Sequence, residues 1–276
     1  MYRVGKVLNH NAVIVIWSED NREYLLMGKG IGFGKKVSQE IKKREEDTVY
    51  SMREVSEHGS AKAILSDVSP ECLELADELL GKAEKEFGVI DRSILFPMAD
   101  HIAYALKRIR AGEQISNPLT DDIRVLFYKE YKVAGELKAL VGDRMGLCID
   151  EHEIGYVALH IHSAIDAEKV SQSMQMARAV RECVSIVEQD TGKEIDVSTL
   201  AYNRLMNHVR YMVARVHTGE KLKVSMNDYM QVKHPLSFET AKKICDEMGR
   251  SLNCQFEEIE IGYLAMHIER STEQEK

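Results

Sequence analysis

Four histidines of this 276-residue chain recur as two pairs with one spacing. His101 and His160 lie 59 residues apart, and so do His208 and His267. A histidine ring can bind a metal ion, move a proton or accept a phosphoryl group at one of its nitrogens. Because a single histidine at the edge of a helical core is more often a structural residue, it is the repeated spacing that points to chemistry.

Phosphoryl acceptance suits these pairs better than metal binding or acid–base catalysis. The chain has no His-Glu-x-x-His motif, and His160 and His162 point to opposite sides of a helix, where one ion cannot be chelated. Acid–base catalysis lacks a nucleophile motif. A phosphoryl acceptor needs an exposed ring nitrogen and nearby cations, and Arg108 and Arg215 follow the first histidine of each pair by about two helical turns. We therefore predict no metal site, no cofactor and no catalytic residue.

The histidines belong to segments that occur twice. Residues 154–161, IGYVALHI, return at 261–268 as IGYLAMHI, an offset of 107 residues, and residues 100–104 return at 207–211 with the same offset. These segments keep the apolar spacing of an amphipathic helix. The sequence therefore predicts two homologous all-α helical bundles, one at residues 65–170 and one at 174–276.

Local patterns place the helices within the first repeat. Ser69 followed by Pro70 is typical of a helix N-terminus. The apolar residues after them trace one face of a helix: Leu73, Ala76, Leu79, Leu80 and Ala83. We expect His160 at the rim of the apolar face of its helix, and His101 at the beginning of another helix.

The N-terminal residues have a β pattern instead. Short apolar runs separated by turn residues predict strands at 4–8, 13–17, 24–27 and 48–50, with a hairpin between the second and third. Residues 42–47 are predicted to be a charged linker. Residues 1–58 should therefore form a small all-β domain, which buries little apolar surface and should dimerise or pack on a neighbour.

A run of alternating glycines, GKGIGFGKK, occupies residues 28–36. It is not a P-loop, because lysines stand at position 29, where glycine is required, and at position 36, where Ser or Thr is required. The dinucleotide fingerprint fails as well, since its third glycine would fall on Phe33 or Lys35. An aromatic ring among mobile glycines and lysines is typical of a surface that stacks unpaired bases and contacts phosphates. A glycine-rich hairpin loop without a ligand explains the pattern equally well.

The distribution of charge favours a polyanion partner at the N-terminus. The whole chain carries a net charge of −8, but residues 1–43 contain eight Lys or Arg against four Asp or Glu. Five scattered cysteines without a Cys-x-x-Cys motif indicate reduced thiols. No signal peptide or apolar run of membrane-spanning length is present, so we expect a cytoplasmic protein without stable membrane insertion.

The basic β segment with GKGIGFGKK, followed by two repeats with Gly-Tyr-x-Ala-x-His-Ile, resembles the BglG/SacY family of bacterial transcriptional antiterminators over essentially the whole chain. The motifs are most similar to the glucose-specific branch. The resemblance implies a non-enzymatic protein with an RNA-binding co-antiterminator domain and two PTS regulation domains (PRDs). It also implies a homodimer that binds an mRNA hairpin overlapping a terminator, so that sugar-uptake genes are transcribed.

The resemblance also implies roles for individual residues. The implied RNA-binding residues are Lys6, Asn9, Asn11, Gly28, Lys29, Gly30 and Phe33. The implied phosphorylation sites are His101 and His160 in the first PRD and His208 and His267 in the second. In the family, the first pair is inhibitory and is phosphorylated by a sugar-specific enzyme II, and the second is often activating and is phosphorylated by HPr.

Two other functions would keep the histidine pairs. PRDs also occur in DNA-binding transcription activators, but the N-terminus here has a β pattern and no helix-turn-helix. A phosphocarrier enzyme would use the histidines and leave the basic glycine run unexplained.

Overall fold

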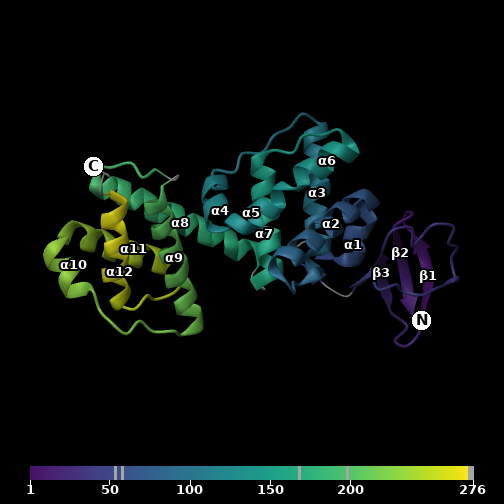
Figure 1. Cartoon of the computed structure of the whole chain (residues 1–276), viewed down its shortest axis with the longest axis horizontal. Helices are drawn as coiled ribbons and strands as arrows, with labels where there is room; N and C mark the ends of the chain where they lie inside the picture. The colour runs from purple at the N-terminus through teal and green to yellow at the C-terminus, as the bar shows by residue number, and fades with distance from the viewer. Residues whose placement is uncertain (53–54, 57–58, 167–168, 197–198, 273–276) are drawn as a thin grey trace. The chain divides into compact units, whose positions relative to one another are not determined.

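The computed structural model describes residues 1–52, 55–56, 59–166, 169–196 and 199–272 (Figure 1). Strands occupy the N-terminal part of these residues, and helices occupy the rest. The predicted fold class, a small all-β domain followed by all-α domains, is confirmed.

The N-terminal strands form a five-stranded antiparallel sheet in the order β4-β1-β2-β3-β5. Its strands are β1 (Tyr2–Val7), β2 (Ala12–Trp17), β3 (Glu23–Met27), β4 (Glu40–Ile41) and β5 (Thr48–Ser51). All four predicted strands are confirmed, and β2 pairs with β3 in the predicted hairpin. A second, two-stranded sheet joins β6 (Val55–Ser56) to β7 (Gly59–Ser60).

Strand β4 was not predicted, because two residues are too few to show an alternating pattern. The prediction of a linker at residues 42–47 is consequently wrong: this segment connects β4 to β5 within the sheet domain. One cluster of buried apolar residues holds the domain together, namely Val4, Val13, Val15, Leu26, Ile31 and Ile41.

The chain divides into two compact units, each described here by itself. The first comprises Met1–Ser116 and Lys129–Glu168 and so contains the sheet domain. Its helical elements are α1 (Ala61–Asp67), α2 (Pro70–Phe87), the 3-10 helix η1 (Arg92–Ile94), α3 (Leu95–Arg110), α5 (Tyr128–Gly135), α6 (Leu137–Met145) and α7 (Glu151–Asp166).

The second unit comprises Asn117–Tyr128 and Lys169–Lys276. Its helices are α4 (Thr120–Leu126), α8 (Val170–Thr191), α9 (Leu200–Thr218), α10 (Asn227–Lys233), α11 (Pro235–Ser251) and α12 (Ile259–Thr272). The hydroxyl of Tyr202 on α9 donates a hydrogen bond to Asp122 of α4 at 2.9 Å, and both residues are buried. Helix α4 therefore packs within the second unit although it precedes α5 in the chain.

The predicted domain ranges, 1–58, 65–170 and 174–276, stay predictions. The boundary at residue 58 and the end at residue 276 lie outside the described residues.

The helix patterns are largely confirmed. All five residues of the predicted apolar face of α2 are buried, and Ser69 stands at the N-cap position, although its side chain does not cap the helix. His101 lies in the middle of α3 rather than at its beginning, so that prediction is wrong. Pro97 lies in the first turn of α3, where a proline is tolerated because the N–H groups of that turn have no partner within the helix.

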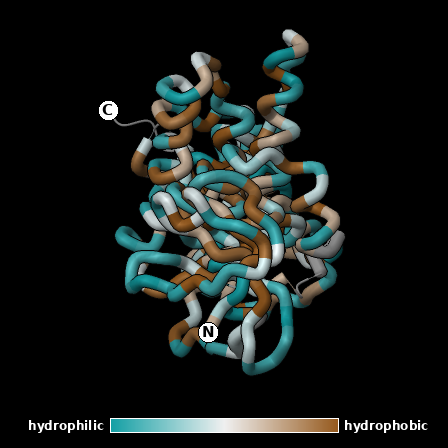
Figure 2. The backbone as a smooth tube through the Cα atoms, turned by 90° about the vertical axis from the view of Figure 1, so that its right-hand side faces the viewer, coloured by the Kyte–Doolittle hydropathy of each residue, from teal (hydrophilic) through white to brown (hydrophobic). Residues whose placement is uncertain are grey.

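No helix in the described ranges is long and apolar enough to span a membrane. Figure 2 shows the reason, since hydrophilic residues interrupt the apolar stretches along the backbone.

Candidate functional sites

Residues 28–34, which follow β3 and are called the glycine loop below, have one buried and one exposed side. The loop folds as turns, and the hydrogen bond from Phe33 N to Gly30 O is 3.1 Å long. Ile31 is buried in the core of the sheet domain. Phe33 is 69% exposed, and its ring packs edge-on with that of His10, with centroids 5.3 Å apart. The loop is thus anchored by an aliphatic side chain and presents an aromatic ring to solvent.

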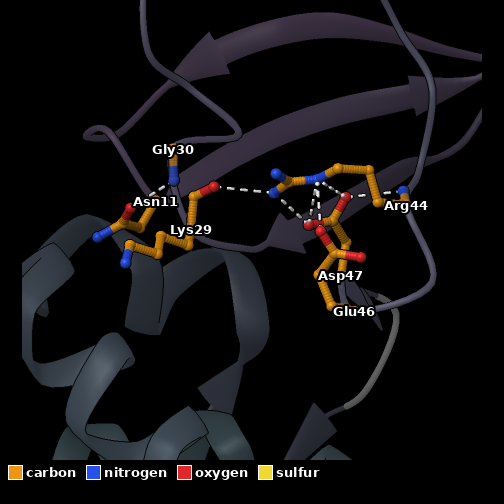
Figure 3. A network of polar contacts seen from close by, with 6 residues as sticks. All are labelled: Asn11, Lys29, Gly30, Arg44, Glu46 and Asp47. Carbon is orange, nitrogen blue, oxygen red and sulfur yellow. Dashed lines mark hydrogen bonds and ion pairs between the residues drawn. The ribbon is translucent and has the colours of Figure 1, made fainter.

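The tip of the β1–β2 hairpin holds the glycine loop in place. Asn9 Oδ1 accepts hydrogen bonds from the backbone N–H groups of Asn11 and Ala12, at 2.8 and 2.9 Å. Asn11 Oδ1 accepts one from the N–H of Gly30 at 2.8 Å (Figure 3). Gly32 lies so close to Asn9 that a Cβ atom on it would be 2.3 Å from the Asn9 carbonyl oxygen. This close approach requires glycine.

The remaining predicted RNA-binding residues lie in or beside the same loop. Gly28 N donates to Asn11 O at 2.9 Å, and Lys29 is exposed in the loop. Lys6 is exposed on β1, where it pairs with Ile14. The structure therefore brings six of the seven predicted residues together at one end of the sheet, with Lys6 on the neighbouring strand.

The side-chain amide nitrogens of Asn9 and Asn11 contact a helix of the same unit. Both donate to Oε1 of Glu74 on α2, at 2.6 and 3.1 Å. A second polar contact joins the sheet domain to the helices, where Arg92 donates to the hydroxyl of Tyr50 at 3.0 Å. The two asparagines thus use their oxygens to shape the loop and their nitrogens to bind Glu74.

In the first unit, His101 on α3 and His160 on α7 lie with ring centroids 5.5 Å apart. Nε2 of His101 is 3.1 Å from Oε2 of Glu153, an ion-pair distance if the ring is protonated. Arg108 donates to the other oxygen, Oε1, through Nε and Nη2 at 3.1 and 2.7 Å. Although burial raises the pKa of Glu153, its contacts with His101 and Arg108 outweigh burial and lower that pKa below its usual value. Glu153 is therefore an anion at neutral pH.

The expectation that His160 lies at the rim of its helix face is wrong. His160 and His162 are 5% and 4% exposed, so both sides of α7 are covered here. Nδ1 of His162 lies 3.0 Å from a carboxylate oxygen of Glu130. His101 is the more accessible member of the first pair, with 18% of its side chain exposed.

In the second unit, the equivalent histidines stack on each other. The rings of His208 on α9 and His267 on α12 have centroids 4.5 Å apart and planes inclined by 26°. Arg215 binds both oxygens of Glu260, at 2.6 and 2.8 Å. Burial, followed by the positive charges of a protonated His267 and of Arg215, lowers the pKa of His208 to about 3. Burial likewise lowers the pKa of His267.

The arginines beside the two histidine pairs bind their glutamates differently. In the first unit Arg108 takes one oxygen of Glu153 and leaves the other near His101, whereas Arg215 takes both oxygens of Glu260. The sequence reasoning missed Glu153 and Glu260. They recur at the same offset of 107 residues as the histidines, so extending the repeat by one position toward the N-terminus would have found them.

The repeats also differ two residues after the second histidine of each pair. Glu269 stands in the second repeat where the first has His162. Ser237 donates to Glu269 Oε2 at 2.5 Å, and Nδ1 of His234 lies 3.3 Å from Oε1. Within the described ranges, no group of three or more His, Cys, Asp and Glu is arranged to hold a metal ion.

Comparison with known families assigns three segments that make up most of the chain. Residues 2–58 match the CAT RNA binding domain, and residues 73–164 and 181–271 each match the PRD domain. These matches cover the sheet domain and both segments that contain histidine pairs.

Two curated relatives match this chain over almost its whole length. The glcA/glcB genes antiterminator of Staphylococcus carnosus is 28% identical over 279 residues, covering 99% of this chain and 96% of the relative. Transcription antiterminator LicT of Bacillus subtilis is 28% identical over 279 residues, covering 99% of both chains. The crystal structure of GlcT CAT-PRDI is 32% identical, with a TM-score of 0.52, and covers 60% of this chain and 98% of that one.

The low pKa of His208 predicts an acid-sensitive second unit. A histidine whose pKa is lower in the folded than in the unfolded chain contributes stability that is complete above about pH 6.5 and is lost as pH falls toward 3. Wild type should therefore lose about 1–2 kcal/mol more unfolding free energy than His208→Gln between pH 7 and pH 5. Urea titrations at both pH values measure this difference.

The exposed neighbour Asn207 provides the control, since Asn207→Ala should keep the acid sensitivity of wild type. NMR of the His208 ring should also show no titration between pH 5 and pH 8. A ring that titrates near pH 6.5 would contradict the buried, neutral state.

Proposed function

The chain belongs to the family of transcription antiterminators that combine a CAT RNA binding domain with two PRD domains, and we propose how it performs this function. It is an RNA-binding antiterminator regulated through its PRDs. We propose that its ligand is an mRNA hairpin that overlaps a terminator, and that binding lets transcription continue into genes for PTS sugar uptake.

The proposed RNA surface consists of the glycine loop, the β1–β2 tip and Lys6. The observation that carries this assignment is the hydrogen bond from Gly30 to Asn11, which joins the loop that bears the exposed Phe33 to the hairpin tip that bears both asparagines. An exposed ring can stack on an unpaired base, amides can hydrogen-bond base edges, and the ammonium groups of Lys6 and Lys29 can contact phosphates. The excess of basic residues in the N-terminal segment supports the same surface.

The proposed regulation acts at the two histidine pairs. We assign phosphorylation to His101 and His160 as inhibitory, with a sugar-specific enzyme II as donor, and to His208 and His267 as activating, with HPr as donor. A phosphoryl group adds about two negative charges. On His101 this charge would lie next to the Glu153 carboxylate and compete for Arg108, so the pairing between α3 and α7 would change.

We also propose that the active form is a homodimer. The five-stranded sheet has a small core cluster of six buried residues, and its edge strand β4 is only two residues long. A domain of this size gains stability from a partner surface. Phosphorylation of the two PRDs would then act by changing how two copies of the chain associate.

The RNA surface predicts distinct losses for two variants of the full chain. Lys29→Ala should weaken binding to a hairpin with internal loops about tenfold. It should also reduce the slope of log K against log salt concentration by about one, because one phosphate contact is lost. Phe33→Ala should weaken binding by about 1–3 kcal/mol with unchanged salt dependence, because it removes stacking alone. Fluorescence anisotropy titrations at several salt concentrations measure both effects.

Arg22→Ala is the matched control, because Arg22 is exposed in the β2–β3 turn, at the other end of the sheet from the glycine loop. Tight binding by both the Lys29 and the Phe33 variants would exclude the proposed surface. Preference for duplex DNA over the looped hairpin would instead favour a DNA-binding activator.

The inhibitory role of the first pair predicts the effect of a fixed charge. His101→Asp or His160→Asp should lower antitermination in a reporter, because an added carboxylate imitates the negative charge of a phosphoryl group at this pair. Gln114→Asp adds the same charge at an exposed position after α3 and should leave the reporter unchanged. Full activity of both histidine variants would argue against inhibition at this pair.

The contact with Glu74 predicts a variant that binds RNA more tightly. Because the amide nitrogens of Asn9 and Asn11 donate to Glu74, RNA must displace this carboxylate to use them. Glu74→Ala should therefore strengthen binding several-fold, whereas Glu71→Ala, an exposed change on the same helix, should have no effect. Equal affinities of wild type and Glu74→Ala would show that the contact does not compete with RNA.

A further inference from the structure

The loop between β4 and β5 carries an ion pair that the RNA surface described above does not include. Asp47 lies in this loop with 0% of its side chain exposed. A buried carboxylate is costly unless charged and hydrogen-bonding partners compensate it. Such a residue therefore needs a structural explanation.

Arg44 supplies most of the compensation. Its Nη2 lies 2.6 Å from Asp47 Oδ1, and its Nε lies 3.1 Å from both carboxylate oxygens. The backbone N–H of Arg44 donates to Oδ2 at 2.8 Å. These contacts fix the planar guanidinium group in one orientation, which a lysine could not reproduce.

The fixed guanidinium group reaches the glycine loop. Nη2 of Arg44 donates to the carbonyl oxygen of Lys29 at 2.9 Å (Figure 3). The carbonyl carbon of Lys29 is bonded to the nitrogen of Gly30, whose N–H donates to Asn11 at 2.8 Å. The C=O of Lys29 and the N–H of Gly30 belong to one planar peptide group. Arg44 and Asn11 therefore hold the same peptide plane from its two opposite sides.

Gly28 makes this arrangement possible. A Cβ atom on Gly28 would lie 1.9 Å from Asp47 Oδ1 and 3.2 Å from Arg44 Nη2. The absence of a side chain at residue 28 is therefore required by the ion pair beneath it, independently of any ligand.

We propose that Arg44 is a positioning residue of the RNA site, which together with Asn11 orients the Lys29–Gly30 peptide plane. This inference rests on the proposed function of the glycine loop. Fixing that plane fixes the direction in which Lys29 and, through the following turn, Phe33 are presented. Because Asp47 compensates the charge of Arg44, the arginine acts through the loop and contributes no phosphate contact of its own.

The test compares variants of the full chain in binding to a looped RNA hairpin at several salt concentrations. Arg44→Ala should weaken binding about tenfold, as expected for loss of a charge-assisted hydrogen bond, with the salt dependence of wild type. Asp47→Asn should weaken RNA binding to a similar extent. Arg44→Lys should bind RNA little better than Arg44→Ala does. Glu46→Gln is the control: Glu46 lies 3.4 Å from Arg44 with 65% of its side chain exposed, and its change should leave affinity unaltered.

Two outcomes would overturn the proposal. One is wild-type affinity of Arg44→Ala. The other is a loss of salt dependence as large as that of Lys29→Ala, which would make Arg44 a direct phosphate contact. If Arg44→Ala does not fold, the Arg44→Lys and Asp47→Asn variants decide by the same criteria.

A second measurement separates this proposal from the proposed function. Amide hydrogen exchange of Gly30 should become faster in Arg44→Ala than in wild type without RNA, because its peptide plane is released on one side. Failure of wild type to prefer the looped hairpin would refute the RNA surface. Unchanged exchange at Gly30 would refute the positioning role by itself.

Discussion

The buried carboxylate of Asp47 is the constraint on which the glycine-loop end of the sheet domain depends. It fixes Arg44, which holds one side of the Lys29–Gly30 peptide, and it requires that residue 28 have no side chain. Asn11 holds the other side of the same peptide. A glycine loop would otherwise be mobile, since its residues have wide conformational freedom. Contacts from two neighbouring loops therefore replace the rigidity that the loop's own sequence lacks.

The helical domains rest on a comparable constraint, a buried glutamate bound by a partly exposed arginine, which occurs once in each repeat. Removing either partner would leave an uncompensated charge, so the pair fixes the spacing between the helices that carry the histidines. The number of carboxylate oxygens that the arginine binds differs between the repeats, and so does the environment of the neighbouring histidine ring. A free oxygen faces His101, whereas His208 has a stacked ring as its neighbour. The same repeated residues thus give two histidine pairs with different electrostatics.

Polar contacts join the sheet domain to the first helical domain beside the glycine loop and at β5. Glu74 on α2 binds the amides of Asn9 and Asn11, and Arg92 binds Tyr50 of β5. Helix α2 also packs on α3, which carries His101. Helix α2 therefore contacts both α3 and the asparagines that shape the glycine loop, so it connects the first histidine pair to that loop.

The sequence by itself determined the fold class, the four longer strands, the repeated histidine pairs and the family. These follow from local periodicity and from spacing, which the order of residues contains directly. Only the tertiary structure showed β4, the burial of His160 and the roles of Glu153, Arg44 and Glu74. Residues 42–47 look like a solvated linker, because a run of charged residues does not indicate which of them will be buried. Asp47 lies beneath Gly28, a glycine 19 residues earlier in the chain, and only folding brings the two together.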